Sequence, residues 1–185
     1  MHATLSDQEF ELFKALIYQQ VGIDLDNPKK TLLVSRLGKR LRELNLSSYK
    51  DYYDCVSGKD GDEELMKLLD LVSTNKTDFY REPVHFDFLR DQVIPEMQAA
   101  RTLRIWSSAS SSGEEPYTIA MTVRDAIPDV TRWNVKILAS DISTRVLSKA
   151  ASGIYEIERV SQLSGELVKG LFRSRQKIPS GARLM

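Results

Sequence analysis

Two adjacent glutamates and a run of serines stand in the stretch IWSSASSSGEEPYT, which spans residues 105–118. Glu114 and Glu115 follow a loop of small residues, and a second apolar run, WNVKILASD, ends in Asp141. Small side chains let a ligand approach the backbone at the start of a helix, and an acidic residue after the next strand typically accepts two hydrogen bonds from a ribose diol. The residue types and their order therefore predict a site for a nucleoside.

The two glutamates indicate what kind of nucleoside this site would bind. A pyrophosphate held at the start of the helix would meet desolvated carboxylates, which would repel it. A cationic nucleoside without phosphates suits the charges better, and S-adenosylmethionine has a ribose diol, a sulfonium, an ammonium and a carboxylate. Arg81, in TNKTDFYRE, is the candidate partner of that carboxylate, since a planar guanidinium can hold it through two hydrogen bonds.

These residues also have simpler explanations. A serine- and glycine-rich loop between a strand and a helix is often an ordinary turn, and Arg81 beside Glu82 fits a surface ion pair. The loop has neither the lysine of a phosphate loop nor the G-x-S-x-G pattern of a nucleophile elbow. The residues alone favour S-adenosylmethionine over NAD, whose glycine pattern is missing, and leave the ordinary turn open.

Two strand–helix units would position the site. LRIWSSAS and WNVKILASD are short apolar runs, and the helical stretches EEPYTIAMTVRDAI and ISTRVLSKAASG follow them. This alternation predicts a parallel α/β sheet, in which a ligand binds at the carboxyl ends of the strands. A complete doubly wound sheet has about five or six strands, so we expect the C-terminal part of the sheet to be missing. An incomplete sheet exposes an apolar edge, which favours a swapped oligomer.

The first part of the chain has a helical period instead. SDQE at residues 6–9 is a capping box, and Pro83, between the two parts, suits the first turn of a later helix. Four apolar stripes follow the capping box: Phe10, Phe13, Ile17 and Val21; Leu33, Leu37, Leu41 and Leu44; Tyr49, Tyr52, Tyr53 and Val56; and Leu65, Leu68, Leu69 and Val72. Residues 1–72 are thus predicted to form a small all-helical domain.

Composition argues against several classes of protein. The 185 residues carry 26 Lys and Arg against 26 Asp and Glu, so the net charge gives no reason to expect a nucleic-acid partner. Cys55 is the single cysteine, which leaves no internal disulfide and no cysteine-based metal site. No window approaches the roughly 18 apolar residues of a membrane span. We expect a cytoplasmic protein without membrane insertion and without a bound metal.

Three blocks of the sequence carry a resemblance to a known family. They are STNKTDFYREPVHF, RIWSSASSSGEEPYTIAM and ILASDISTRVLSKAASGIY, in this order behind the helical part. The chain resembles the CheR family of chemotaxis methyltransferases over nearly its whole length. The resemblance implies an all-α N-terminal domain at residues 1–72 and a Rossmann-like S-adenosylmethionine-dependent methyltransferase domain at residues 73–185. Residues 156–185 would be the start of a small β-subdomain.

The resemblance also implies roles for individual residues. Asn75, Thr77 and Arg81 would line the methionine end of S-adenosylmethionine, with Arg81 on its carboxylate. In GEE the second glutamate, Glu115, would contact the cofactor, and Asp141 would hold the ribose hydroxyls. These five residues are the expected cofactor site, which would release S-adenosylhomocysteine as the product.

The function that the resemblance implies is methyl transfer to glutamate side chains of bacterial chemoreceptors, which forms methyl esters in chemotactic adaptation. A carboxylate is already ionised at neutral pH, so the enzyme mainly has to align it with the methyl group. We therefore expect no general base and assign no catalytic residue. The alternatives are a non-catalytic module that binds cofactor or receptor, and an inactive fragment.

A basic cluster on the second predicted helix is the candidate for binding the receptor. Arg36, Lys39, Arg40 and Arg42 lie beside the leucine stripe of this helix. On sequence alone, such a run is more often a solvated helix face. The resemblance implies instead that it docks against the acidic methylation region on the cytoplasmic helices of a methyl-accepting receptor.

Overall fold

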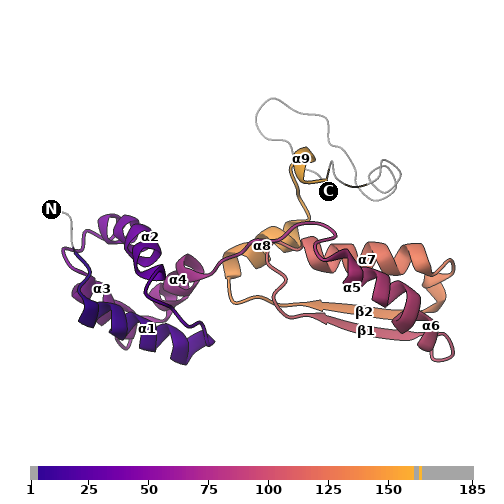
Figure 1. Cartoon of the computed structure of the whole chain (residues 1–185), viewed down its shortest axis with the longest axis horizontal. Coiled ribbons are helices and arrows are strands. Elements are labelled where there is room, and N and C mark those ends of the chain that lie inside the picture. The colour runs from indigo at the N-terminus through magenta and orange to yellow at the C-terminus, as the bar shows by residue number, and fades with distance from the viewer. Residues whose placement is uncertain (1–3, 161–162, 164–185) are drawn as a thin grey trace. The chain divides into compact units, whose positions relative to one another are not determined.

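The computed structural model describes residues 4–160 and 163. The chain divides into two units, residues 1–74 and residues 75–185 (Figure 1). The described part of the first unit forms the helices α1 (Asp7–Val21), α2 (Lys29–Glu43), α3 (Tyr49–Ser57) and α4 (Asp62–Val72). The described part of the second unit forms α5 (Pro83–Phe88), the π-helix η1 (Leu89–Val93), α6 (Ile94–Glu96), β1 (Thr102–Ser107), α7 (Glu114–Ala126), the 3-10 helix η2 (Val130–Arg132), β2 (Asn134–Ala139), α8 (Thr144–Ser152) and α9 (Ile157–Val160).

Local capping residues start and end the helices of the first unit. Ser6 Oγ accepts a hydrogen bond from the N–H of Glu9 at 3.2 Å, and the carboxylate of Glu9 accepts one from the N–H of Ser6 at 2.8 Å. This reciprocal pair is the predicted capping box. Ser48 caps α3 by accepting from the N–H of Asp51 at 3.1 Å. α1 ends at Gly22, whose φ of 71° is the left-handed conformation that favours glycine.

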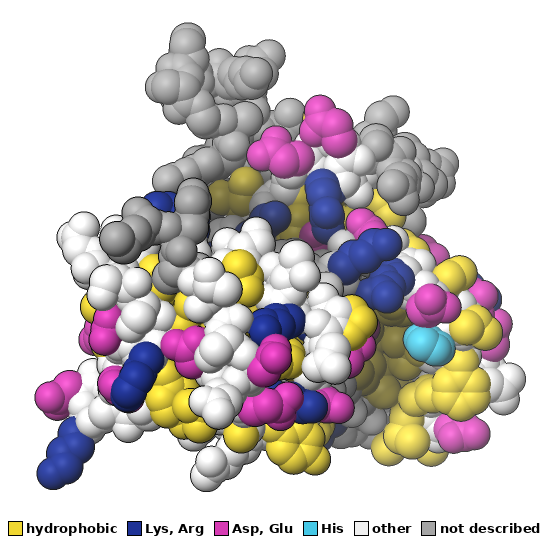
Figure 2. Space-filling model, turned by 60° about the vertical axis from the view of Figure 1, so that its left-hand side comes forward, with side chains coloured by type: hydrophobic (Ala, Val, Ile, Leu, Met, Phe, Trp, Pro, Cys, Tyr) yellow, Lys and Arg dark blue, Asp and Glu magenta, His cyan; other side chains and the backbone are white. Residues whose placement is uncertain are grey.

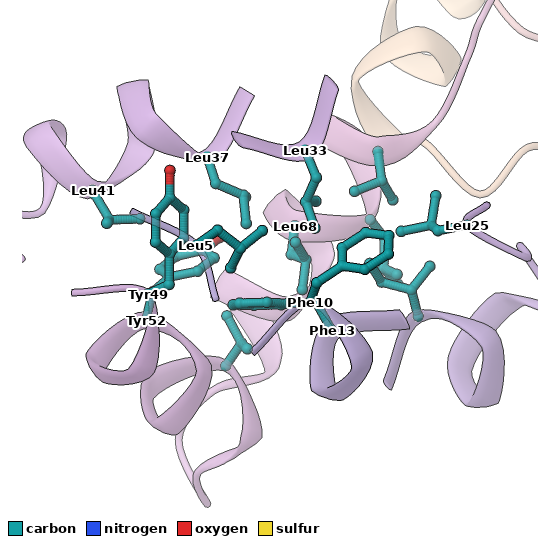
Figure 3. Close-up of a cluster of buried hydrophobic side chains, with 14 residues drawn as sticks. Leu5, Phe10, Phe13, Leu25, Leu33, Leu37, Leu41, Tyr49, Tyr52 and Leu68 are labelled. Carbon is teal, nitrogen blue, oxygen red and sulfur yellow. The ribbon is translucent and has the colours of Figure 1, made fainter. Parts of the chain in front are cut away.

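The helices of the first unit enclose one hydrophobic core. In Figure 3, α2 presents a stripe of leucines toward aromatic rings from α1 and α3. Its labelled members are Leu5, Phe10, Phe13, Leu25, Leu33, Leu37, Leu41, Tyr49, Tyr52 and Leu68. Burying an apolar side chain of this size contributes about 1.5–3 kcal/mol. The predicted apolar stripes are confirmed, with partial burial at their margins for Val21, Leu44, Tyr53 and Leu65.

The second unit contains the predicted parallel strand pair. β1 and β2 pair in register from Thr102 with Asn134 to Ser107 with Ala139. α5, α6 and α7 lie on one side of this pair (Figure 1). The apolar residues of this layer are Phe86, Leu89, Leu103, Ile105, Ile119, Val123, Val135 and Ile137. On the opposite face, Trp106 is 66% exposed. The strand–helix alternation seen in the sequence is therefore confirmed.

The segment before β1 is a helix with one wide turn. Pro83 occupies the first turn of α5, as predicted, where its missing N–H costs no helical hydrogen bond. The wider turn of η1 ends immediately before Ile94 and Pro95, the first two residues of α6. Pro95 cannot donate a helical hydrogen bond, and a π-turn is one way for a helix to accommodate such an interruption.

The end of the chain contains one described element after α8. α9 is a short helix at Ile157–Val160. The expected start of a β-subdomain at residues 156–185 lies, after residue 160 and apart from Leu163, outside the described residues. Among the residues that are described, no helix is long and apolar enough to cross a membrane.

Candidate functional site

The candidate site is built where β1 and β2 end. The N–H of Ser110 donates to the carbonyl of Ser140 at 2.9 Å, and the N–H of Ser140 donates to the carbonyl of Ser107 at 3.0 Å. These bonds tie the loop after β1 to the loop after β2. Both loops lie at the carboxyl edge of the parallel strands, which is the usual place for a ligand in an α/β fold.

Asp141 joins the two loops through its carboxylate. Its Oδ2 accepts a hydrogen bond from the N–H of Ser111 at 2.8 Å, and its Oδ1 accepts one from the N–H of Ser143 at 2.9 Å. A carboxylate has about four acceptor positions, so these two bonds leave acceptor capacity for ligand hydroxyls. The acidic residue that the sequence singled out for a ribose thus lies against the serine loop.

The two adjacent glutamates at the start of α7 have different surroundings. Glu114 is 0% exposed; its Oε2 accepts from Ser112 Oγ at 2.7 Å, and its Oε1 pairs with Arg159. Glu115 is exposed and accepts from Ser107 Oγ at 2.7 Å. Of the two carboxylates, the one on Glu115 is accessible to a ligand, whereas protein encloses the one on Glu114.

A close contact links the GEE motif to the SGIY motif. Gly113 has a φ of 98°, and a Cβ atom there would lie 2.6 Å from the hydroxyl oxygen of Tyr155. That hydroxyl donates to the carbonyl of Ser112 at 2.7 Å. Burial raises the pKa of the Tyr155 hydroxyl, which keeps it protonated as a donor. Sequence reasoning missed this contact, because its partners are far apart in the chain and neither has a charge.

Residues 75–81 are held against the serine loop through their backbone. Ser111 Oγ donates to the carbonyl of Asn75 at 3.1 Å. Arg159 Nη2, from α9, donates to the carbonyl of Thr77 at 2.6 Å. The structure therefore brings the TNKTDFYRE segment to the same strand ends as Glu115 and the serine loop. Arg159 was not among the residues predicted for the site, since nothing in the local sequence marks it.

Arg81 lies between two residues in the left-handed backbone conformation. Its neighbours Tyr80 and Glu82 have φ values of 53° and 56°, and Ser111 in the facing loop has a φ of 48°. Such left-handed conformations are uncommon for residues other than glycine, and they cluster at ligand sites. Arg81 is exposed, and its Nη1 donates to the carbonyl of Lys76 at 2.9 Å. A guanidinium has five donors, so others can reach a ligand carboxylate.

Two family models match this chain. The all-alpha domain of CheR methyltransferases matches residues 8–73, and the SAM binding domain of CheR methyltransferases matches residues 75–179. The chain belongs to the CheR methyltransferase family. The two matches cover the helical part and the strand–helix part in the order that the sequence resemblance implied, so that resemblance is confirmed.

Curated relatives have names that agree with the CheR family. The chain is 41% identical to a probable chemotaxis protein methyltransferase of Rhizobium etli, over 85% of this chain and 60% of the relative. It is 40% identical to chemotaxis protein methyltransferase 2 of Pseudomonas aeruginosa, over 89% and 58%, respectively. It is 38% identical to the chemotaxis protein methyltransferase of Escherichia coli, over 91% and 57%. The chain thus spans about 60% of the length of these relatives.

The cofactor of a CheR SAM-binding domain is S-adenosylmethionine, as the charges of the loop predicted. The residues at the strand ends fit this molecule: the carboxylates of Glu115 and Asp141 suit its cationic and hydroxyl groups, and Arg81 suits its carboxylate. In the same loop, Ser110 Oγ is buried without a hydrogen-bond partner among the described residues. No three His, Cys, Asp or Glu side chains of the described part are placed to hold a metal.

Two cations of the CheR N-terminal domain are engaged inside it. Arg40 forms a bidentate pair with Glu64, at 2.7 Å from Nε to Oε1 and 2.6 Å from Nη2 to Oε2. Arg36 Nη1 donates to the carbonyls of Leu71 and Ser73 at 2.6 and 3.1 Å. Arg36 therefore holds the end of α4 and Arg40 its start, a role that the spacing of the basic run did not reveal.

The other two members of the predicted basic cluster, Lys39 and Arg42, project into solvent. The side chain of Lys39 is 77% exposed and lies 3.8 Å from the carboxylate of Glu43, and Arg42 is exposed as well. On the face of the molecule shown in Figure 2, Lys and Arg side chains are interspersed with Asp and Glu. Lys39 and Arg42 are the members of the predicted cluster that a partner can reach without breaking a buried pair.

Proposed function

We propose that this protein acts as a protein-glutamate O-methyltransferase, which transfers methyl groups from S-adenosylmethionine to glutamate side chains of bacterial chemoreceptors in the cytoplasm. The observation that carries the proposal is the meeting of three separate segments at the strand ends. The segments are residues 75–81, the loop that leads to Glu115, and Asp141. Membership of the CheR family and the names of the relatives support the same function.

Within this proposal each side chain at the site has a role set by its charge. Asp141 accepts hydrogen bonds from the ribose hydroxyls, and Glu115 pairs with the cationic methionine end. Arg81 binds the carboxylate of the cofactor, and Asn75 and Thr77 line the same end. A bidentate guanidinium and carboxylate acceptors hold a zwitterionic ligand in one orientation, so the five residues fix where the methyl group points.

The chemistry that the cofactor supplies is an activated methyl group. A bond forms between a carboxylate oxygen of the receptor and the methyl carbon while the carbon–sulfur bond breaks, which gives a glutamate methyl ester and S-adenosylhomocysteine. The attacking carboxylate is ionised at neutral pH, so no side chain has to remove a proton. The protein contributes mainly by holding two oppositely charged groups in line.

The receptor partner is proposed to dock on the basic side of α2. Lys39 and Arg42 offer exposed charge to an acidic helical surface, which would raise the association rate and fix the register of docking. Arg36 and Arg40 contribute to the same electrostatic potential while they hold α4. The partner is thus the methylation region on the cytoplasmic helices of a chemoreceptor.

Two measurements test the proposal. Isothermal titration should detect binding of S-adenosylhomocysteine and no binding of NAD. Labelled methyl groups from S-adenosylmethionine should then appear on a receptor cytoplasmic fragment as base-labile esters. Absence of ester with the protein and its receptor would contradict the proposed activity. Cofactor binding without transfer would instead support a non-catalytic module that binds cofactor or receptor.

A further inference from the structure

We infer that Glu114 and Arg159 form a clamp that positions the backbone at Thr77 for the cofactor. We call this pair the 114–159 clamp. It assigns Glu114, the first glutamate of GEE, a role different from that of its neighbour Glu115. It also means that α9, which follows the SGIY motif, helps to position the cofactor site through Arg159. The inference rests on the proposed function, because it concerns the same site.

The surroundings of Glu114 are those of a positioning group. Its side chain is 0% exposed, so no ligand can touch it without a rearrangement. One carboxylate oxygen accepts from Ser112 Oγ at 2.7 Å, and the other pairs with Arg159 Nη2. A buried carboxylate is costly unless it is paired and hydrogen-bonded, and Arg159 is the cation that supplies this pairing.

The same nitrogen of Arg159 contacts residues 75–81, which we call the cofactor segment. Nη2 donates to the carbonyl of Thr77 at 2.6 Å and lies 3.6 Å from Oδ1 of Asp78. The side chain of Arg159 is 36% exposed, so solvent would compete for it if Glu114 did not hold it. A terminal guanidinium nitrogen has two N–H groups, which match the two acceptors, Thr77 and Glu114. The charge of Glu114 thereby fixes the direction of the bond to Thr77.

A second connection ties the cofactor segment to the same turn of α7. The N–H of Tyr80 donates to Thr118 Oγ1 at 3.2 Å, and Thr118 Oγ1 donates to the carbonyl of Glu114 at 2.6 Å. Residues 77 and 80 are therefore both anchored to Glu114, one through its side chain and one through its backbone. Asn75 and Arg81 lie on either side of these anchor points, so a shift of the segment would move both.

The experiment uses the matched variants Glu114→Gln, Arg159→Met and their double variant. Hydrogen exchange should show faster exchange of the amides in residues 75–81, with the rest of the second unit unchanged. The Kd for S-adenosylhomocysteine should rise about tenfold in each single variant, and the double variant should be no worse than either, because coupled partners are not additive. Arg145→Met and Glu156→Gln, at exposed positions of the same unit, serve as controls and should change neither measurement.

The two readouts separate the clamp from the proposed function. Slower or unchanged exchange of residues 75–81 in all three variants would overturn the clamp, even if cofactor affinity falls. Additive losses of affinity in the double variant would also overturn it. Arg159→Met leaves the buried carboxylate of Glu114 unpaired. If this variant unfolds the second unit, the double variant, in which residue 114 has no charge, provides the test of the clamp. Failure of the unchanged protein to bind S-adenosylhomocysteine would contradict the proposed function, while exchange would still decide the clamp.

Discussion

Each unit of the protein contains a buried glutamate from the first turn of a helix, held by an arginine from another helix. In the first unit, Glu64 of α4 pairs with Arg40 of α2. In the second unit, Glu114 of α7 pairs with Arg159 of α9. The two pairs have the same chemistry, and both carboxylates also accept from a hydroxyl, of Tyr52 and Ser112, respectively.

The difference lies in what else each arginine holds. Arg40 donates from Nε and Nη2 to Glu64 and from Nη1 to Glu43, at 2.8 Å, so these bonds all go to side chains of the helical unit. Arg159 divides one nitrogen between Glu114 and a backbone carbonyl of the cofactor segment. An Arg–Glu pair therefore stabilises the packing of two helices in the first unit. In the second unit, we infer that the pair of the same kind positions residues 75–81. Stability measurements should respond to both pairs, because both carboxylates are buried, whereas binding measurements should respond to the second pair alone.

The largest expected effect comes from Arg40→Met. This change removes the bidentate partner of the buried Glu64 carboxylate and leaves only the half-exposed Lys67, at 3.5 Å, which should lower the free energy of unfolding of the first unit by about 3 kcal/mol. Urea unfolding followed by circular dichroism measures it, with Lys39→Met on the same helix as the control. A loss below about 1 kcal/mol would show that this pair is not what holds α4 to α2. The double variant Arg40→Met/Glu64→Met should recover most of the loss.

The next largest effect is expected from Glu115→Gln, which should change cofactor affinity but not stability. Glu115→Gln keeps the size of the side chain and an acceptor for Ser107 Oγ, but it removes the charge that we propose pairs with the cofactor. We expect the Kd for S-adenosylhomocysteine to rise about tenfold, which corresponds to about 1.4 kcal/mol, with an unchanged melting temperature. Isothermal titration and calorimetric unfolding of the same sample give both numbers. A shift in melting temperature with unchanged affinity would reverse the roles assigned to the adjacent glutamates.

The stability of the first unit should depend on pH through Glu64. Hydrogen bonds from Arg40 hold the pKa of Glu64 below the usual range of a glutamate. A carboxylate whose pKa is lower in the folded state contributes stability above its unfolded pKa of about 4.3, and this contribution is lost as the pH falls through the folded value. Urea midpoints of the first unit should therefore fall as the pH is lowered below about 4.3. Arg40→Met should flatten this part of the profile, and an unaltered profile in that variant would contradict the assignment.

The smallest effect on stability should come from the exposed cations of α2. The double variant Lys39→Glu/Arg42→Glu should change the free energy of unfolding by no more than about 0.5 kcal/mol, since neither side chain is buried. Receptor methylation should nevertheless fall, and should become less sensitive to salt. The informative control is Lys50→Glu on α3, another exposed cation of the same unit. Equal losses of methylation in both variants would remove α2 as the docking face.

Features that depend on neighbouring residues were predictable from the sequence. The capping box of α1, Pro83 at the start of α5 and the two strands follow from local patterns, and the structure has all of them. The location of the candidate site was also predictable in part, since parallel strands bring their carboxyl ends to one edge of the sheet. Asp141 and the serine loop are joined there for that reason.

Features that depend on which charges meet across the fold were not predictable. Arg40 and Glu64 are 24 residues apart, and Arg159 and Glu114 are 45 apart. In the sequence, each of these residues resembles a member of an ordinary solvated face. Only packing decides that Arg40 meets a buried carboxylate while the side chain of Lys39, one position earlier, stays largely in solvent. The roles of the five predicted cofactor residues and of the basic cluster stay predictions until ligand and receptor binding are measured.

The exposure of Trp106 allows the site to be followed by intrinsic tryptophan fluorescence. The chain has 2 tryptophans. Trp133 is 8% exposed, whereas Trp106 is 66% exposed and donates from Nε1 to Ser140 Oγ at 2.9 Å, beside Asp141. A solvated indole emits at longer wavelength and is quenched by iodide, so the two emissions can be separated without a label. The longer-wavelength emission then reports on the end of the site where we propose that the nucleoside binds, and the shorter-wavelength emission reports on the interior of the same unit.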